Sequence, residues 1–475
     1  NPLLRFSNQN IFGKVSPPGL PLGLAYLASF LMRAGFKVSA IDANLENISN
    51  SAIGNRLPEN PPDIIGITSY TPGSPSVYEL AEICKSKYPS TKIVVGGPHF
   101  SVLPEEALSS EVIDYVIRGD GEETFLELAN GHKLSEIDGL SFKMNKSFFH
   151  NKDRQKLIEL DRLPFPAYEL FNPKKYSGTL GRAKQKHSAS IITSRGCPFS
   201  CAFCQAGCLH KTFRIRSAEN ILAEIELLIN NYGIKEFAFQ DDILTFNKKI
   251  LIQLCELLVK KDIKITWSCL SRVDTIDREL LKVMKSAGCY QIGFGIESGN
   301  DNILRQIHKN ITIAKAEAAV KMAQSLNFEV ATYFMLGLPG ETRETLRQTL
   351  KFSRSLNVDY CLYNILVPLP RTEIYEWAKK EGYLATTDWK KYTGSEVILD
   401  LPSLHNVDLK AYYKNAFIKF YLNPSYILRH LKKMRSLIDL MYAIKGMLLI
   451  TLGGLSKETN SAGTQGEGGD STVSS

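Results

Sequence analysis

The sequence of 475 residues lacks the segments that mark membrane and exported proteins. No run reaches the roughly 18 apolar residues of a transmembrane helix, and the nearest, Met447–Leu455, is too short. The first residues, Asn1–Arg5, have neither the basic start nor the long apolar stretch of a secretory signal. We therefore expect a cytoplasmic protein without a membrane-spanning helix.

Charge and cysteine content exclude two further classes. The 57 Lys and Arg against 49 Asp and Glu leave a net charge of +8 that is spread along the chain, so no nucleic-acid partner is expected. The nine cysteines are an odd number and show no disulfide framework, which suits a reducing cytosol. The content of 44% hydrophobic residues, at this length, allows two or three folded domains.

Three cysteines in one short stretch carry the strongest chemical signal. Cys197, Cys201 and Cys204 follow the apolar run 190–193 at Cys-x-x-x-Cys-x-x-Cys spacing. Three thiolates on one loop can hold three irons of a [4Fe–4S] cluster and leave the fourth iron open. A structural zinc site would close with four ligands. A loop of buried or zinc-binding cysteines is the alternative.

This stretch, with the aromatic Phe203 before its last cysteine, resembles the cluster loop of the radical S-adenosylmethionine (SAM) enzymes. The resemblance implies that the amino and carboxylate groups of SAM chelate the open iron. It also implies that one electron from the cluster cleaves SAM to a 5′-deoxyadenosyl radical, which requires an electron donor such as a flavodoxin or a ferredoxin. Cys208 lies four residues beyond the triad and is interpreted as a packed loop cysteine.

Around this loop, strand and helix patterns alternate about six times. The alternation predicts a partial (βα)6 barrel over residues 188–372, whose chemistry belongs at the carboxyl ends of the strands. The predicted strands are 190–193, 236–240, 264–267, 290–293, 329–334 and 360–367, and the predicted helices between them are 218–230, 248–260, 278–286, 314–325 and 343–355.

Residues suited to SAM follow these strands. In the family that the loop resembles, acidic groups after the second strand accept from the ammonium of SAM. Arg272 suits a bidentate pair with the methionyl carboxylate, and Glu297 suits both ribose hydroxyls. For each charged residue singly, a surface ion pair is the alternative. The residues predicted to bind SAM are Phe203, Asp241, Asp242, Arg272, Gly295, Glu297 and Gly337.

Residues 1–135 show a second alternation of strands and helices. Strands are predicted at 37–41, 63–69, 92–95 and 114–117, with helices at 24–34 and 77–87, which favours a doubly wound, Rossmann-like parallel sheet. Ligands of such sheets bind at the carboxyl ends of the strands. A Rossmann-like domain of another kind remains the alternative.

Three segments, 17–27, 95–99 and 118–123, resemble the cobalamin-binding domain that precedes many radical SAM domains. The Asp-x-His-x-x-Gly motif of classical cobalamin carriers is missing from the sequence. The resemblance therefore implies a corrin without a histidine below the cobalt, and the nearby His99 is interpreted as structural. The residues predicted to bind cobalamin are Leu22, Gly23, Thr68, Ser69, Gly96, Gly97, Gly119 and Glu122.

The remaining segments are assigned by composition. Residues 136–187 are predicted to be a linker, 373–455 a helical C-terminal region and 456–475 a disordered tail rich in Ser, Gly and Thr. The basic stretch 429–435 precedes apolar residues, so the segment 429–455 is either a peripheral membrane contact or a helix packed on the barrel. Arg371 stands where relatives commonly have Gly and places a cation near the barrel mouth.

Together these resemblances imply a cobalamin-dependent radical SAM enzyme acting on a small molecule, a lipid or a tetrapyrrole. The leading function is C-methylation, in which a substrate radical takes a methyl radical from methylcobalamin and each turnover consumes two SAM. One alternative keeps the cofactors without methyl transfer, as in the anaerobic cyclase of chlorophyll precursors. The other, from a different class, is a non-catalytic iron–sulfur or corrin-binding protein.

Overall fold

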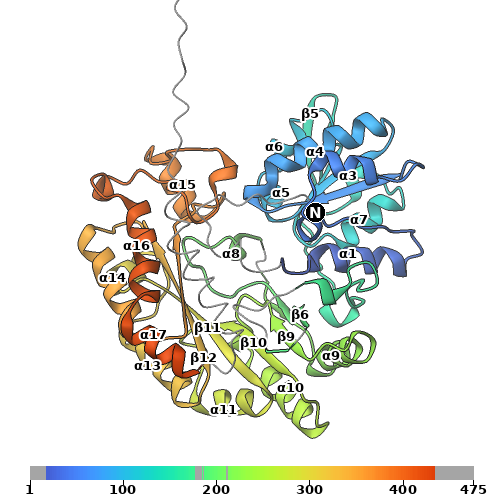
Figure 1. Cartoon of the computed structure of the whole chain (residues 1–475). Coiled ribbons are helices and arrows are strands. Elements are labelled where there is room, and N and C mark those ends of the chain that lie inside the picture. The colour runs from blue at the N-terminus through green and yellow to red at the C-terminus, as the bar shows by residue number, and fades with distance from the viewer. Residues whose placement is uncertain (1–17, 177–183, 186, 210–211, 434–475) are drawn as a thin grey trace, which may run out of the picture.

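The computed structural model describes residues 18–176, 184–185, 187–209 and 212–433. Figure 1 shows two α/β parts, the first (blue to cyan) facing the open side of the second (green to orange). The short helix α8 (Ala206–Leu209) lies between them. One hydrophobic core contains helix α1 (Leu22–Arg33) together with strands of the second part, so the two parts pack directly against each other.

The first part is built on a five-stranded sheet in the order β1-β2-β3-β4-β5. Strands β1, β2 and β3 are parallel, as predicted, and β4 and β5 add an antiparallel hairpin. That hairpin lies within residues 136–187, so the prediction of a bare linker is wrong for this stretch, and the domain continues past residue 135. The strands are β1 (Ile64–Thr68), β2 (Lys92–Gly96), β3 (Tyr115–Ile117), β4 (Leu140–Met144) and β5 (Ser147–His150).

Helices and turns cover this sheet, and its predicted first strand does not form. Residues 37–41 make no ladder with β1, and most of their side chains are exposed, so apolar alternation there gives no strand. The elements are α1, α2 (Ala43–Glu46), α3 (Asn50–Arg56), the turn η2 (Thr71–Gly73), α4 (Ser74–Lys87), α5 (Pro98–Val102), α6 (Pro104–Leu108), α7 (Glu122–Ala129), and the turns η3 (Leu134–Glu136), η4 (Leu160–Arg162) and η5 (Pro173–Lys175).

The second part is an open sheet of six parallel strands in the order β13-β12-β11-β10-β9-β6. This is the predicted partial barrel, and in the described residues its edge strands β6 and β13 do not pair. The strands are β6 (Ser188–Ile191), β9 (Glu236–Phe239), β10 (Thr266–Ser271), β11 (Cys289–Glu297), β12 (Glu329–Leu336) and β13 (Tyr360–Ile365).

The predicted helices surround the outer face of this sheet, because each buries an apolar stripe against the strands (Figure 1). Side-chain caps start most of them, as Ser217 does for the first. The elements are α9 (Ala218–Tyr232), the turn η6 (Leu244–Phe246), α10 (Lys248–Lys260), α11 (Arg278–Ser286), α12 (Asp301–Gln306), α13 (Ile313–Ser325) and α14 (Arg343–Ser355).

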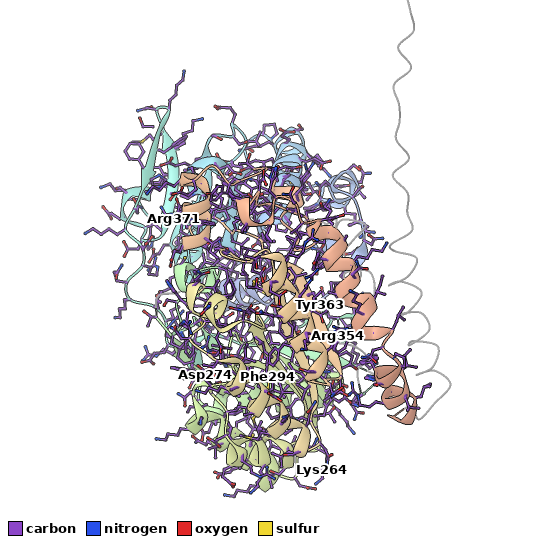
Figure 2. All side chains as sticks on the ribbon, turned by 90° about the vertical axis from the view of Figure 1, so that its left-hand side faces the viewer. Lys264, Asp274, Phe294, Arg354, Tyr363 and Arg371 are labelled. Carbon is purple, nitrogen blue, oxygen red and sulfur yellow. The ribbon has the colours of Figure 1, made fainter. Side chains whose placement is uncertain are left out.

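The carboxyl ends of the barrel strands point toward the first part. In Figure 2, Lys264 precedes β10 and lies at the far end of the molecule, whereas Asp274 follows β10 and lies nearer the first part. Arg371, which follows β13, lies nearer still. The edge of the sheet where barrel chemistry belongs therefore faces the Rossmann-like part.

The C-terminal region packs beside β13. The hydroxyl of Tyr421 accepts from the backbone N–H of Cys361, and that of Tyr426 donates to the carbonyl of Asp359. None of the helices in this part of the chain, or elsewhere among the described residues, is long and apolar enough to cross a membrane. Residues 434–455 and the tail 456–475 lie outside the described residues. The elements are α15 (Glu373–Lys380), the turns η7 (Trp389–Lys391) and η8 (Pro402–Leu404), α16 (Leu409–Tyr421) and α17 (Pro424–Lys433).

Candidate cofactor site

A short antiparallel hairpin, not predicted from the sequence, frames the cysteine loop. Strands β7 (Ser194–Arg195) and β8 (Arg214–Ile215) pair at its two ends. Within the loop, the N–H of Ala202 donates to the carbonyl of Ile307 at 3.0 Å, and the N–H of Ile374 donates to the carbonyl of Ala202 at 3.1 Å. The loop is therefore fixed to the segments that follow β11 and β13.

The cysteine triad is half-buried within this loop. Burial raises the pKa of Cys204 to about 11, and burial also raises the pKa of Cys197, against the backbone N–H of Phe199. The three thiols are close enough that charge on one raises the pKa of the next. In the described part of the chain, no three His, Cys, Asp or Glu are gathered as around a single metal ion. A cubane suits this arrangement better, because each thiolate binds a different iron.

The two aspartates after β9 have different environments. Asp241 is fully buried and accepts from the hydroxyls of Thr193 and Ser194 at 2.8 and 2.5 Å, and from the Thr193 N–H. Burial raises the pKa of Asp241 against these hydrogen bonds. Its carboxylate therefore holds the start of the cysteine loop. Asp242 is exposed, and its charge raises the pKa of both Cys197 and Cys204. Of the two aspartates predicted to bind SAM, Asp242 is the one whose charge acts on the cysteine triad.

Arg272 also lies against the loop, with 4% of its surface exposed. Its Nε and Nη2 donate to the two carboxylate oxygens of Asp274, each at 2.9 Å. The guanidinium lies 3.9 Å from the ring centroid of Phe199, and its Nη1 lies 3.7 Å from the Sγ of Cys201. The structure thus brings Arg272 to the triad, with most of its donors already in use.

A buried ion pair joins the end of β11 to the loop. Lys309 Nζ donates to Glu297 Oε1 at 2.8 Å, and both side chains are 7% exposed. A Cβ on Gly295 would lie 2.6 Å from the same Oε1, so only glycine leaves room for the pair. Glu297 has a φ of +75° at a register shift in the sheet, a strained geometry that is common at functional sites. The Lys309 ammonium lies 5.9 Å from the ring of Phe203.

Gly337 begins the turn after β12 and has a φ of +85°. The N–H groups of Gly337 and Leu338 donate to Glu341 Oε2 at 2.7 and 3.0 Å. Burial raises the pKa of Glu341 to about 8. Gly337 also lines a cavity of about 200 Å³ with aliphatic side chains such as Leu366 and Leu401. This turn, which carries the predicted SAM residue Gly337, is therefore held by hydrogen bonds and borders open space.

Residues predicted for cobalamin meet at the ends of β1 and β2. A Cβ on Gly97 would lie 2.6 Å from Thr68 Oγ1 and 2.9 Å from the Ser69 carbonyl, and Gly97 has a φ of +96°. Glycine is needed there for close packing. Tyr70 follows with a side chain 64% exposed. Desolvation by surrounding atoms raises its pKa, and the charge of Asp242 raises it further. The charge of Asp242, beside the triad, therefore reaches Tyr70 of the first part.

Three of the cobalamin predictions acquire other partners. Leu22 is buried in the core shared with the barrel. The Gly119 N–H donates to Ser101 Oγ, at a φ of +71°. Glu122 is 5% exposed and pairs with Arg195, the residue two before Cys197. Glu122 thus links the first part to the cysteine loop. Neither of the other two predicted glycines is required by close packing. A Cβ on Gly23 would have no heavy atom within 4 Å, and a Cβ on Gly96 would lie 3.5 Å from the Ile117 carbonyl, an ordinary contact distance.

His99 is completely buried, and both of its ring nitrogens have partners. Nδ1 lies 3.3 Å from Thr71 Oγ1 and Nε2 lies 3.3 Å from Glu106 Oε1. Glu106 also accepts from Trp389 Nε1 at 3.1 Å, which ties α6 to the C-terminal turn η7. This arrangement supports the interpretation of His99 as a structural residue.

Sequence reasoning missed four residues of this region: Lys309, Arg195, Tyr70 and Trp389. Lys309 and Arg195 each carry a charge whose partner is distant in sequence, so no local pattern reveals them. Tyr70 directly follows the predicted Thr68-Ser69 pair, and that position could have indicated it.

The cysteine loop at the mouth of an open parallel barrel, facing a Rossmann-like sheet, defines an iron–sulfur enzyme with a second cofactor domain. Family models agree: residues 191–353 match the radical SAM superfamily and residues 10–129 match the B12 binding domain. An uncharacterised methyltransferase of Pyrococcus horikoshii is 35% identical over 92% of this chain and 95% of its own length. The anaerobic magnesium-protoporphyrin IX monomethyl ester cyclase of Rubrivivax gelatinosus is 26% identical over 86% of this chain and 74% of its own length.

Among solved structures, the radical SAM methyltransferase TsrM of Kitasatospora setae, with cobalamin and a [4Fe–4S] cluster bound, shares the fold. Its TM-score is 0.71 at 17% identity, over 94% of this chain and 98% of TsrM. The chain belongs to the radical SAM family, in the branch with a B12-binding domain. It is an enzyme, and its cofactors are a [4Fe–4S] cluster, SAM and cobalamin. The predicted fold class and family are confirmed.

Proposed function

We propose that this enzyme methylates an unactivated carbon of a small-molecule substrate. The observation that carries the proposal is the approach of the two cofactor regions: Glu122 of the first part pairs with Arg195, two residues before Cys197, at 2.6 Å. Methyl transfer to a carbon radical needs both cofactors at one substrate. The 35% identical relative from Pyrococcus horikoshii carries the name of a methyltransferase, which also supports the proposal.

The chain's residues suit the cofactors by their donor chemistry. Cys197, Cys201 and Cys204 would ligate three irons, and the strand ends at Thr68, Ser69 and Gly97 would hold the corrin. When bound, the cluster supplies the electron that cleaves SAM, and the corrin supplies the methyl group. Asp242 would accept from the ammonium of SAM, and Phe203, the residue before Cys204, would line the same site.

The barrel and the first part would together position the substrate and exclude water from it. In this proposal the pair Glu297–Lys309 and the turn at Gly337 would line the SAM site. Glu297 would accept from the ribose hydroxyls while it keeps its hydrogen bond from Lys309. Arg371 follows β13 with a φ of +64°, a conformation that a side chain adopts at a cost. Its cation near the barrel mouth would favour a substrate with an anionic group.

The test is anaerobic reconstitution of the full chain with cobalamin, SAM and a reductant, followed by mass spectrometry of candidate lipids, tetrapyrroles and other small molecules. A product heavier by about 14 Da supports methylation. An oxidised product without methyl gain would replace this proposal with a cyclase-type reaction. If the protein binds iron and corrin but never cleaves SAM, the proposed radical SAM activity is wrong.

We further propose a flavodoxin or ferredoxin as electron donor, and a cytoplasmic location with peripheral membrane contact through residues 429–455. On α17, Tyr426 and Arg429 contact the barrel strand β13 region, whereas Leu428 and Leu431 are 58% and 49% exposed. This exposed apolar face supports membrane contact. Liposome flotation of the full chain and of Leu428→Ser/Leu431→Ser tests it, and equal recovery of both proteins in the lipid-free fraction would rule it out.

A further inference from the structure

The donors of Arg272 are almost fully committed within the protein. A guanidinium has five N–H groups. Asp274 takes two of them, on the Nε and Nη2 edge, and the Lys309 carbonyl takes the second N–H of Nη2 at 2.7 Å. The two remaining N–H groups are both on Nη1, which lies 3.7 Å from the Sγ of Cys201. A bidentate pair with an incoming carboxylate would therefore require Asp274 or Lys309 to release Arg272.

The position of Arg272 is also fixed by packing. Its guanidinium stacks on Phe199, which lies between the first two cysteines of the triad. Phe199 in turn contacts Phe246 of the turn η6 at 6.0 Å between ring centroids. The side chain is 4% exposed, so its charge is poorly screened by water. A fixed, buried cation thus points its remaining donor at one cluster ligand.

We propose that Arg272 hydrogen-bonds the Cys201 thiolate and raises the reduction potential of the cluster, rather than serving chiefly as the partner of the SAM carboxylate. Hydrogen bonds to the sulfurs and nearby charge set the potential of iron–sulfur clusters. A cation beside the ligand favours the reduced cluster, which carries one more negative charge. Asp274 and the Lys309 carbonyl are positioning groups that hold the guanidinium in place. This inference rests on the proposed role of the cysteine triad.

The test is a redox titration of the reconstituted full chain, without SAM, followed by the electron paramagnetic resonance (EPR) signal of the reduced cluster. In Arg272→Met, we expect the ratio of reduced to oxidised cluster at a fixed potential to fall at least tenfold, about 59 mV for one electron. Arg272→Lys keeps a positive charge beside Cys201, so its potential should lie between those of Arg272→Met and the wild type. Arg354→Met removes a cation from helix α14 and should leave the potential unchanged; its place is labelled in Figure 2.

A second measurement distinguishes this role from carboxylate binding. If the potential of Arg272→Met without SAM equals that of the wild type while SAM affinity falls, Arg272 serves the carboxylate and the proposal is wrong. If Arg272→Met does not fold, Arg272→Gln replaces it, and a potential equal to that of the wild type in that variant contradicts the proposal. Wild-type protein that takes up no iron on the triad would instead overturn the proposed function.

Discussion

The pair Glu122–Arg195 offers a direct test of how the first part is coupled to the cysteine loop. Arg195 Nη2 donates to Glu122 Oε1 at 2.6 Å, and Nη1 donates to Oε2 at 3.2 Å. Asp120 lies 3.3 Å from the same guanidinium, which also stacks over the ring of Tyr26 at 5.2 Å. The perturbation is Glu122→Gln, which keeps the shape of the side chain and removes its charge.

The expected loss of stability follows from burial. The side chains of Glu122 and Arg195 are 6% and 15% exposed, so the variant leaves a largely buried cation with Asp120 as its remaining partner. Removing one member of a buried pair costs about 3–5 kcal/mol. Because Asp120 offsets part of this cost, we expect about 2–3 kcal/mol, within the range measured for coupled neighbours. For a chain of 475 residues, the melting temperature should fall by roughly 2–3 °C.

The assay is a double-mutant cycle with Glu122→Gln, Arg195→Met and the double variant, measured by chemical unfolding of the protein without cofactors. A coupling energy near 2 kcal/mol is expected. The matched control is the exposed pair Lys133–Glu136, with side chains 73% and 68% exposed, whose coupling should be below about 0.5 kcal/mol. A coupling for Glu122–Arg195 no larger than that of the control would refute the reasoning. Iron content after reconstitution should fall in Arg195→Met, since Arg195 fixes the start of the loop.

Three further predictions concern single sites. Replacing the whole triad with Ala should remove iron and SAM cleavage together, whereas Cys208→Ala, which loses the contact from its thiol to the Arg371 carbonyl, should retain iron. The pKa of Glu341 is raised from 4.5 to about 8 in the folded protein. Its contribution to the free energy of unfolding therefore becomes increasingly unfavourable as the pH rises from about 4.5 to 8. In a thermal-shift series, Glu341→Gln should therefore gain stability relative to the wild type across that window, and a constant difference would contradict this. The EPR spectrum of bound cob(II)alamin should show no splitting from a protein imidazole, and a splitting lost in His99→Gln would contradict the structural role of His99.

Most of the barrel could be predicted from the sequence, because its helices bury regular apolar stripes and carry local capping residues. The helices 248–260, 278–286 and 343–355 begin and end as predicted. The strand predicted at 37–41 does not form. Alternation is a local pattern, whereas a strand also needs a neighbouring strand to accept its hydrogen bonds. The β4–β5 hairpin was missed because its outer strand, Ser147–His150, is only four residues long, is exposed along its whole length and shows no alternation of apolar and polar residues.

The candidate site was predicted unevenly for similar reasons. The cysteine spacing and the positions after the strands are local signals, and the structure brings Asp242, Arg272 and Glu297 to the barrel mouth around the loop. Partners that are distant in sequence could not be predicted. Asp241 and Asp242 are adjacent in sequence, but their side chains have different surroundings. Asp241 accepts from the hydroxyls of Thr193 and Ser194, whereas the charge of Asp242 acts on Cys204 of the triad. A sequence pattern cannot make that distinction.

The measurement that tests the central claim most directly is the stoichiometry of SAM use during turnover of the reconstituted enzyme with its substrate. Methyl transfer through a corrin after hydrogen abstraction requires one SAM for each task. The account therefore predicts S-adenosylhomocysteine and 5′-deoxyadenosine in equal amounts, each matching the methylated product, with the label of methyl-deuterated SAM in that product. Formation of 5′-deoxyadenosine and product without S-adenosylhomocysteine would contradict it.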